Sequence, residues 1–210
     1  LKSIEEESLR LSSMATNVLN LTKIENQTIL TDISKYDERI EVAVLDNGPS
    51  EDPMTYFFQY DGQLHYVGEV QGFPFNDYSK NELDGFSGQN NVIGMQTVDL
   101  IESAYVDAYY WYDNESHQLE KMDLGEYSYR WFGEHELFMD IPLYYTKDLK
   151  APTKILKAQE KVFFIKTDCK EWILVRGKDG TEGYIHVKDS KITNIGLPAE
   201  DVFSELYFFG

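Results

Sequence analysis

The chain has 210 residues, of which 42% are hydrophobic and 14% aromatic, enough apolar surface to bury the core of one large or two small domains. Its formal net charge of -18 disfavours nucleic acid and anionic membrane surfaces as partners. A single cysteine, Cys169, excludes an internal disulfide bond and every multi-cysteine metal site. No apolar run approaches the roughly 20 residues of a membrane-spanning helix, so we expect no membrane insertion.

Residues 1–30 predict an amphipathic helix from about Ser3 to Ile24. Ser3 and Glu6 have the spacing of a capping box at its start. Spacings of seven, three and four separate the apolar positions, which indicates one helical face. These positions are Ile4, Leu11, Met14, Val18 and Leu21.

The same segment, EEESLRLSSMATNVLNLTKIEN, resembles the second helix of the dimerisation domain of sensor histidine kinases. The resemblance covers about 25 residues and carries over no phosphotransfer residue. A lone helix of this length is marginal in water, so it needs a partner surface. We expect it to pack on the chain's own β domain or, in a homodimer, on a second copy. The contact residues would be Leu11, Met14, Val18 and Leu21.

Residues 31–140 predict an acidic domain of β-hairpins. Apolar and polar residues alternate from Ile40 to Leu45, the run NGPSEDP breaks the chain, and TYFFQY predicts another strand that Asp61 and Gly62 turn. Residues 32–140 carry 5 basic and 23 acidic groups, whereas residues 141–210 carry 11 and 10. This change in charge predicts a domain boundary near Asp140.

An internal repeat runs through the acidic region with an offset of 52 residues. An offset near 50 with several strands per unit suggests a repeat of propeller-blade size. Its clearest matching positions are Phe58, Tyr60, Asp61 and Gly62 with Tyr110, Tyr112, Asp113 and Asn114.

The segment TDISKYDERIEVAVLDNGPSEDPMTYFFQYDGQLHYVGEV resembles degenerate FG-GAP repeats of secreted Gram-positive proteins, and NELDGFSGQNNVIGMQTVDL looks like the following unit. The resemblance implies that a loop could bind calcium, a hard cation that prefers oxygen ligands. The matching positions are Asp32, Ser34, Asp37 and Glu41, and a second loop has Asp77, Ser79, Asn81 and Asp84. The alternative is that these polar residues satisfy backbone groups in turns, with no cofactor bound.

The C-terminal third predicts strands at 162–165, 172–175 and 183–187, with a tight turn at Asp179 and Gly180. Trp172 followed by DGTEGYI resembles bacterial Src-homology-3-like (SH3-like) domains, and PLYYTKDLKAPTKILKAQEKV matches their first strand, variable loop and short apolar entry to the second strand. We therefore expect residues 141–210 to form a small SH3-like β-barrel, and the whole chain to be mainly β.

The last residues predict a short helix that folds back on this domain. Pro198 and Asp201 mark its start. We expect Phe208 and Phe209 to be buried against the domain, since exposed they would favour aggregation. The helical positions are Val202, Phe203, Leu206 and Tyr207.

No catalytic motif is found in the chain. The four histidines lack metal-site spacing, so we expect them at the surface or in hairpins. Carboxylate pairs for a glycan hydrolase could be drawn from several residues, because 37 acidic groups always offer some pair. The residues considered for such a pair are Glu102, Asp107, Glu115 and Asp140.

The two β-domain resemblances imply an extracytoplasmic, non-catalytic binding module of a bacterial surface or secreted protein. It would bind cell-wall glycan or peptide, or a protein partner, and the residues expected to contact the ligand are Trp172, Tyr184 and Tyr144. Two alternatives stay open, a regulatory or assembly protein that dimerises through the N-terminal helix and a glycan hydrolase. The kinase-like helix also leaves a cytoplasmic location open.

Overall fold

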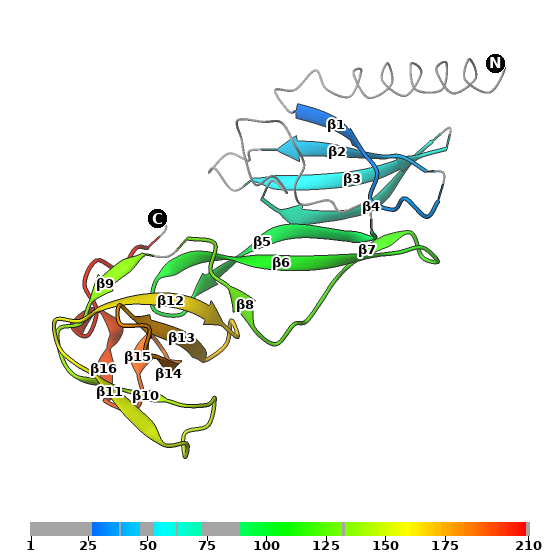
Figure 1. The fold of residues 1–210 in the computed structure, drawn as a ribbon. Helices are drawn as coiled ribbons and strands as arrows, with labels where there is room; N and C mark the ends of the chain where they lie inside the picture. The colour runs from blue at the N-terminus through cyan, green and yellow to red at the C-terminus, as the bar shows by residue number, and fades with distance from the viewer. Residues whose placement is uncertain are drawn as a thin grey trace. The chain divides into compact units, whose positions relative to one another are not determined.

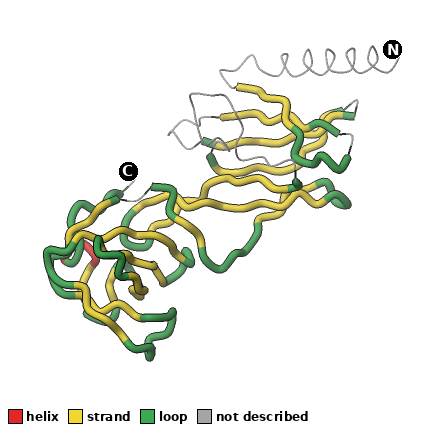
Figure 2. Tube along the Cα trace, in the orientation of Figure 1, coloured by secondary structure: helices red, strands yellow, loops and turns green. Residues whose placement is uncertain are grey.

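The computed structural model describes residues 27–37, 39–46, 53–61, 63–72, 89–131 and 133–208. In these residues the chain is mainly β, as predicted, and the only helix is a short 3-10 segment, η1 (Ala199–Asp201) (Figure 1, Figure 2). The predicted N-terminal helix with its dimer contacts and the loop from Asp77 to Asp84 lie outside the described residues.

The first sheet is a meander of seven antiparallel strands in which each strand pairs with the next. Its burial pattern follows the strand period of two: in the third strand Thr55, Phe57 and Gln59 are buried while the residues between them are partly exposed. The strands are β1 (Gln27–Thr31), β2 (Glu41–Asp46), β3 (Met54–Tyr60), β4 (Leu64–Gln71), β5 (Asn91–Asp99), β6 (Ser103–Asp113) and β7 (Gln118–Lys121).

The repeated sequence positions fall in two hairpins of this sheet, β3 to β4 and β6 to β7. In the first, Asp61 Oδ1 accepts the backbone N–H of Gln63 at 3.4 Å. In the second, Asp113 Oδ1 accepts the backbone N–H of Glu115 at 3.0 Å. An aspartate that accepts a hydrogen bond from the backbone N–H two residues later favours a turn. Asp61 and Asp113, which match in the repeat, therefore stabilise the turns of their hairpins in the same way.

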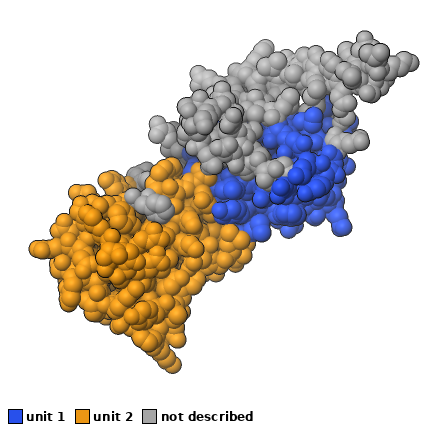
Figure 3. Space-filling model, in the orientation of Figure 1, with its two compact units in different colours: residues 1–95, 108–122 blue, residues 96–107, 123–210 orange. Residues whose placement is uncertain are grey.

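The chain divides into two compact units, which Figure 3 colours separately. The first contains residues 1–95 and 108–122, and the second contains residues 96–107 and 123–210. The predicted boundary near Asp140 therefore falls inside the second unit. The cause is packing: β8 (Tyr127–Ser128) and β9 (Glu134–Glu136), which precede Asp140, both pair with β12 (Lys161–Thr167), which follows it.

The second sheet runs β11, β10, β14, β13, β12, β8 along its main path. Its two ends, β11 and β8, do not pair in the described residues, so the sheet is open and the expected barrel closure is not seen. The strands are β8 (Tyr127–Ser128), β9 (Glu134–Glu136), β10 (Ile141–Tyr144), β11 (Thr153–Leu156), β12 (Lys161–Thr167), β13 (Trp172–Gly177), β14 (Glu182–Lys188), β15 (Lys191–Ile192) and β16 (Leu197–Pro198).

The strand order of this sheet follows the sequence pattern. The predicted strands at 162–165, 172–175 and 183–187 correspond to β12, β13 and β14, which form a meander. Between β13 and β14 the chain turns at Gly180 with φ of 85°, a backbone conformation that glycine adopts without strain. The core of the unit lies on one face of the meander. Its side chains there include Val162, Phe164, Ile173, Val175, Ile185 and Val187.

The C-terminal segment is not the helix that the sequence predicted. After η1, Phe203 forms an isolated bridge with Leu137, and the Ser204 N–H donates to the carbonyl of Glu136 at 3.0 Å. These backbone bonds join the segment to Glu136 and Leu137, and Val202 and Phe203 are buried. Phe208 is 66% exposed, contrary to the expectation, and Phe209 lies outside the described residues.

A buried ion pair joins this segment to the second unit's core. His135 is fully buried, contrary to the expectation of a surface histidine, and stacks on Phe164 with ring centroids 4.5 Å apart. Its Nδ1 donates to the Ser204 carbonyl at 2.9 Å, and its Nε2 lies 3.5 Å from Glu102 Oε1. Burial lowers the pKa of His135, but the Glu102 carboxylate and the Ser204 carbonyl together raise it above the usual value.

We therefore expect the second unit to lose stability as the pH rises through the folded-state pKa of His135. A histidine whose pKa is raised by folding contributes stability that is complete below its unfolded pKa, near 6.5, and disappears above the folded value. Urea unfolding of the wild type and of Glu102→Gln between pH 5.5 and 9 measures this. The wild type should lose more stability than the variant over that interval. Equal losses in the two proteins would contradict a His135 pKa that Glu102 raises.

Candidate functional site

Three aromatic residues predicted to bind a ligand lie on one face of the second sheet. Trp172 and Tyr184 alternate with core-facing side chains along β13 and β14, so they project from the opposite, outer face. Tyr144 is the cross-strand partner of Tyr184, and directly opposed residues share a face. Residues from three separate stretches of sequence thus meet on the outer face of this sheet.

Ring contacts join these residues into one cluster. The Trp172 ring makes edge contacts with Tyr144 at 5.7 Å and with Tyr184 at 6.4 Å between centroids. His186, one of the four histidines that were expected at the surface or in hairpins, contributes a fourth ring 4.7 Å from Trp172. Tyr144 and His186 are nearly buried, whereas Trp172 and Tyr184 keep part of their surface open to solvent. The two buried rings therefore support the two that a ligand can reach.

Charged groups hold the edges of the aromatic cluster. The Tyr184 hydroxyl donates to Glu126 Oε1 at 3.1 Å, and Glu126 also lies 3.6 Å from the ammonium groups of Lys147 and Lys166. Burial, and then the hydrogen bond to Glu126, raise the pKa of Tyr184, so its hydroxyl stays protonated at neutral pH. This network holds the Tyr184 ring in place, and both acidic and basic groups lie beside the ring.

On the other side, His186 is fixed by two polar partners. Its Nδ1 lies 2.8 Å from the Thr193 hydroxyl and its Nε2 lies 3.2 Å from Glu171 Oε2. Both ring nitrogens are therefore occupied, and the imidazole is oriented as a support for Trp172. The surface combines flat apolar rings with hydroxyl, ammonium and carboxylate groups, which suits an amphipathic ligand such as a sugar or an extended peptide.

Three of the four residues that matched a calcium loop make hydrogen bonds within the protein. Ser34 donates to Asn114 Oδ1 at 3.2 Å, and Asp37 Oδ1 accepts the backbone N–H of Arg39 at 2.9 Å. Asp32 is exposed. In the described part of the chain, no group of three or more His, Cys, Asp or Glu residues is placed to hold a metal ion.

Glu41, the fourth residue of that set, faces the core of the first unit. It is 0% exposed, and its two oxygens accept the Ile33 N–H at 2.9 Å and the Gln59 amide at 3.3 Å. Burial, reinforced by the charges of Asp37 and Asp32, raises the pKa of Glu41 to about 7, although its hydrogen bonds oppose the shift. Through these two hydrogen bonds, Glu41 on β2 holds the loop at Ile33 and the Gln59 side chain of β3 together.

Three of the four carboxylates considered for a glycan hydrolase pair with basic side chains. Asp107 pairs with the Arg130 guanidinium at 2.7 Å, and Asp140 pairs with Lys157 at 2.7 Å. Glu102 belongs to the buried pair with His135, and Glu115 lies exposed in the turn after Asp113. Each of these residues has a structural or solvent-exposed position.

Comparisons with known proteins find no match: no family model matches the chain, and neither a curated protein nor a solved structure does. Within the described residues, none of the helical structure is long and apolar enough to span a membrane.

Proposed function

We propose that the chain is a non-catalytic binding module that engages its ligand through the outer aromatic face of the second sheet, Trp172 and Tyr184 supported by Tyr144 and His186. The observation that carries the proposal is the meeting of these rings on a face that the core does not use. Tryptophan and tyrosine dominate binding energy at interfaces because they bury a large area at little entropic cost.

The ligand class that we propose is bacterial cell-wall glycan or its peptide, met outside the cytoplasm. The resemblance to SH3-like domains supports this, and the strand order is compatible with it: β10, a loop at 145–152, the short strand β11 and then the meander β12 to β14. The mixed charges of Glu126, Lys147 and Lys166 beside the rings match a ligand that carries both amide and carboxylate groups.

Cosedimentation with purified peptidoglycan tests the proposal. The wild type should pellet with the polymer in a saturable way, and Trp172→Ala should weaken binding by about 2 kcal/mol or more, roughly 30-fold, as removal of a central aromatic residue does. Because Trp172 also packs against three rings, Tyr184→Ala and a thermal melt of each variant separate lost binding from lost folding.

Trp131→Ala is the matched control, because Trp131 lies in the same unit but is 64% exposed and contacts Tyr105. It should bind as the wild type does. A wild type that stays in the supernatant, or folded Trp172 and Tyr184 variants that pellet unchanged, would overturn the proposal.

A further inference from the structure

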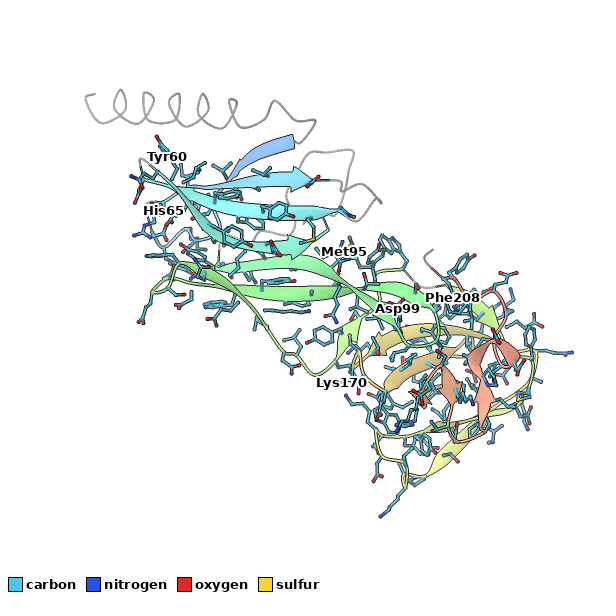
Figure 4. The ribbon with its side chains drawn as sticks, turned by 180° about the vertical axis from the view of Figure 1, so that it is seen from behind. Tyr60, His65, Met95, Asp99, Lys170 and Phe208 are labelled. Atoms are coloured by element: carbon cyan, nitrogen blue, oxygen red, sulfur yellow. The ribbon has the colours of Figure 1, made fainter. Side chains whose placement is uncertain are left out.

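The strand β11 (Thr153–Leu156) forms one edge of the second sheet. Among the described residues it pairs with β10 (Ile141–Tyr144) alone, so no strand lies on its other side. Figure 4 shows the hairpin of β10 and β11, drawn in pale yellow, projecting from the rest of the second unit. A free strand edge carries a row of backbone N–H and C=O groups that another strand can bind.

The register of the hairpin shows which backbone groups of β11 face outward. The Tyr145 N–H donates to the Pro152 carbonyl at 3.1 Å, and hydrogen-bonded pairs recur at every second position of an antiparallel ladder. The next two such pairs are Leu143 with Lys154 and Ile141 with Leu156. Thr153 and Ile155, the outward pair, lie between these positions, so their N–H and C=O groups point away from β10.

The free stretch of this edge is bounded on both sides. By the same alternation, Ala151 and Lys157 are the neighbouring outward positions. The Ala151 N–H already donates to the Asp148 carbonyl at 2.9 Å, and the Lys157 N–H donates to Glu160 Oε1 at 3.1 Å. Only the outward pair is left for a partner, and a further antiparallel strand can form about four hydrogen bonds with its two N–H and two C=O groups.

The side chains of β11 differ between the two faces of the sheet. Ile155 opposes Pro142 on the outer face and is 50% exposed. Lys154 projects to the opposite face, where its ammonium lies 5.3 Å from the centre of the Tyr145 ring. Directly opposed residues of neighbouring strands share a face. A strand added here would therefore place one side chain beside Ile155 and the next one beside Lys154.

The hairpin is basic in a chain that is strongly acidic. Residues 145–157 contain four lysines and one aspartate, a net charge of +3, against -18 for the whole chain. Two of these lysines pair with carboxylates. Among the described residues no carboxylate lies within 4.0 Å of the Lys150 or Lys154 ammonium, and Asp179 acts on Lys154 only at longer range. Charges more than about 8 Å apart are largely screened at physiological ionic strength, so these lysines favour an acidic segment at β11.

Lys154 also argues against a second copy of the chain as the partner. If two β11 strands pair antiparallel through both residues of the outward pair, the two copies of Lys154 lie directly opposite each other. Like charges in that position destabilise a strand pair, and lysine on an edge strand protects proteins from such self-association. The same side chain favours a strand that has an acidic residue there.

We propose that the edge of β11 binds an extended acidic segment of a partner protein, which joins the second sheet as an antiparallel strand. Apolar residues of the segment pack beside Ile155, and acidic residues that alternate with them lie beside Lys154. Hydrogen bonds to the outward pair supply affinity, and the alternation supplies specificity. The edge does not include Trp172 or Tyr184, so either binding assignment can fail without the other.

Titration of the full chain with acetyl-Glu-Val-Glu-Val-Glu-amide, followed by NMR, tests the proposal. The amide signals of Thr153 and Ile155 should shift saturably, because their N–H groups gain carbonyl acceptors. The same peptide methylated on both valine nitrogens should bind at least about tenfold more weakly, since it loses the two donors that face β11. Acetyl-Lys-Val-Lys-Val-Lys-amide should also bind at least about tenfold more weakly, because its charges repel Lys154.

Variants of the chain separate the backbone contacts from the charge. Ile155→Pro removes an outward N–H but no hydrogen bond to β10, so peptide binding should fall about tenfold while the hairpin persists. Lys154→Gln should weaken binding of the glutamate peptide about threefold. Lys188→Gln, at an exposed position on β14, is the matched control and should leave binding unchanged. A thermal melt of each variant checks folding, and the methylated peptide tests the same contact on the wild type.

Several outcomes would overturn the proposal. They are the absence of saturable shifts, shifts confined to another surface, equal binding of the methylated peptide, and equal losses in Lys154→Gln and Lys188→Gln. Analytical ultracentrifugation without peptide covers the remaining alternative. The chain should not self-associate through β11, and a dimer that Ile155→Pro abolishes would show that a second copy occupies the edge.

Discussion

Replacement of Phe164 by alanine is expected to lower the free energy of unfolding of the second unit by about 3–5 kcal/mol, the cost of removing a large aromatic side chain from a packed core. Phe164 is 2% exposed, and its ring contacts those of Tyr129, His135 and Phe203. Its loss would leave a cavity beside the buried ion pair and remove the ring on which Phe203 rests. Urea unfolding of wild type and variant measures the difference.

Phe163→Ala is the matched control for this prediction. Phe163 is the neighbour of Phe164 on β12, its side chain lies on the other face of the strand, and it is only partly buried. We expect it to cost roughly 1 kcal/mol, as substitutions outside a core usually do. Equal losses in the two variants would contradict the assignment of the core to the Phe164 face.

Replacement of Glu41 by glutamine is expected to stabilise the chain more at pH 8 than at pH 4.5, relative to the wild type. Folding raises the pKa of Glu41 from 4.5 to about 7, so the folded state binds a proton that the unfolded state has released. Wild-type stability therefore falls as the pH rises from 4.5 to 7 and stays lower above it. The effect amounts to about 3 kcal/mol at 1.36 kcal/mol per pKa unit.

The quantity to measure is the difference in unfolding free energy between variant and wild type at the two pH values, by urea unfolding. Any loss of hydrogen bonds in Glu41→Gln that does not depend on pH cancels in this comparison. Glu120→Gln, which removes an exposed carboxylate from β7 of the same unit, should show no such change. A difference between Glu41→Gln and the wild type that stays constant from pH 4.5 to 8 would contradict a buried, proton-binding Glu41.

The strands of the second sheet could be predicted from the sequence because their pattern of core-facing and outward-facing residues fits only β-strands. Trp172 and Tyr184 each precede a core residue, Ile173 and Ile185, and Gly180 lies where a tight turn needs positive φ. The convergence of Trp172, Tyr184 and Tyr144 on one face follows from that alternation and from register. The contribution of His186 could not be predicted, since its partners, Thr193 and Glu171, are fixed only by the pairing of the strands.

The role of Glu41 was missed because both faces of β2 are apolar. Val42 faces one cluster of buried residues, whereas Ala43 and Leu45 face another. Alternation alone does not say which face holds the core, so a glutamate on the core face has the sequence pattern of a surface residue. Its partner Gln59 comes from β3, and their contact depends on the pairing of β2 with β3.

The domain boundary near Asp140 was predicted from the distribution of charge. Charged residues lie mostly at the surface, so their distribution does not show which strands pack together. The acidic excess ends near Asp140, yet Val98, Ile101 and Val106 are buried with the C-terminal strands. His135 was expected at the surface for a similar reason. Its partners, Glu102 and the Ser204 carbonyl, are far from it in the sequence, and no local pattern indicates such a pair.

The most direct test of the proposed binding surface is an NMR titration of the full chain with soluble peptidoglycan fragments, because the chain has three tryptophans, Trp111, Trp131 and Trp172, whose indole N–H signals report on different places. We predict saturable shifts of the Trp172 indole and of the Tyr144 and Tyr184 amides, with the Trp111 and Trp131 indoles unchanged. Shifts that leave Trp172 and its neighbours unaffected, or no shifts at all, would contradict the assignment of the outer aromatic face as the ligand site.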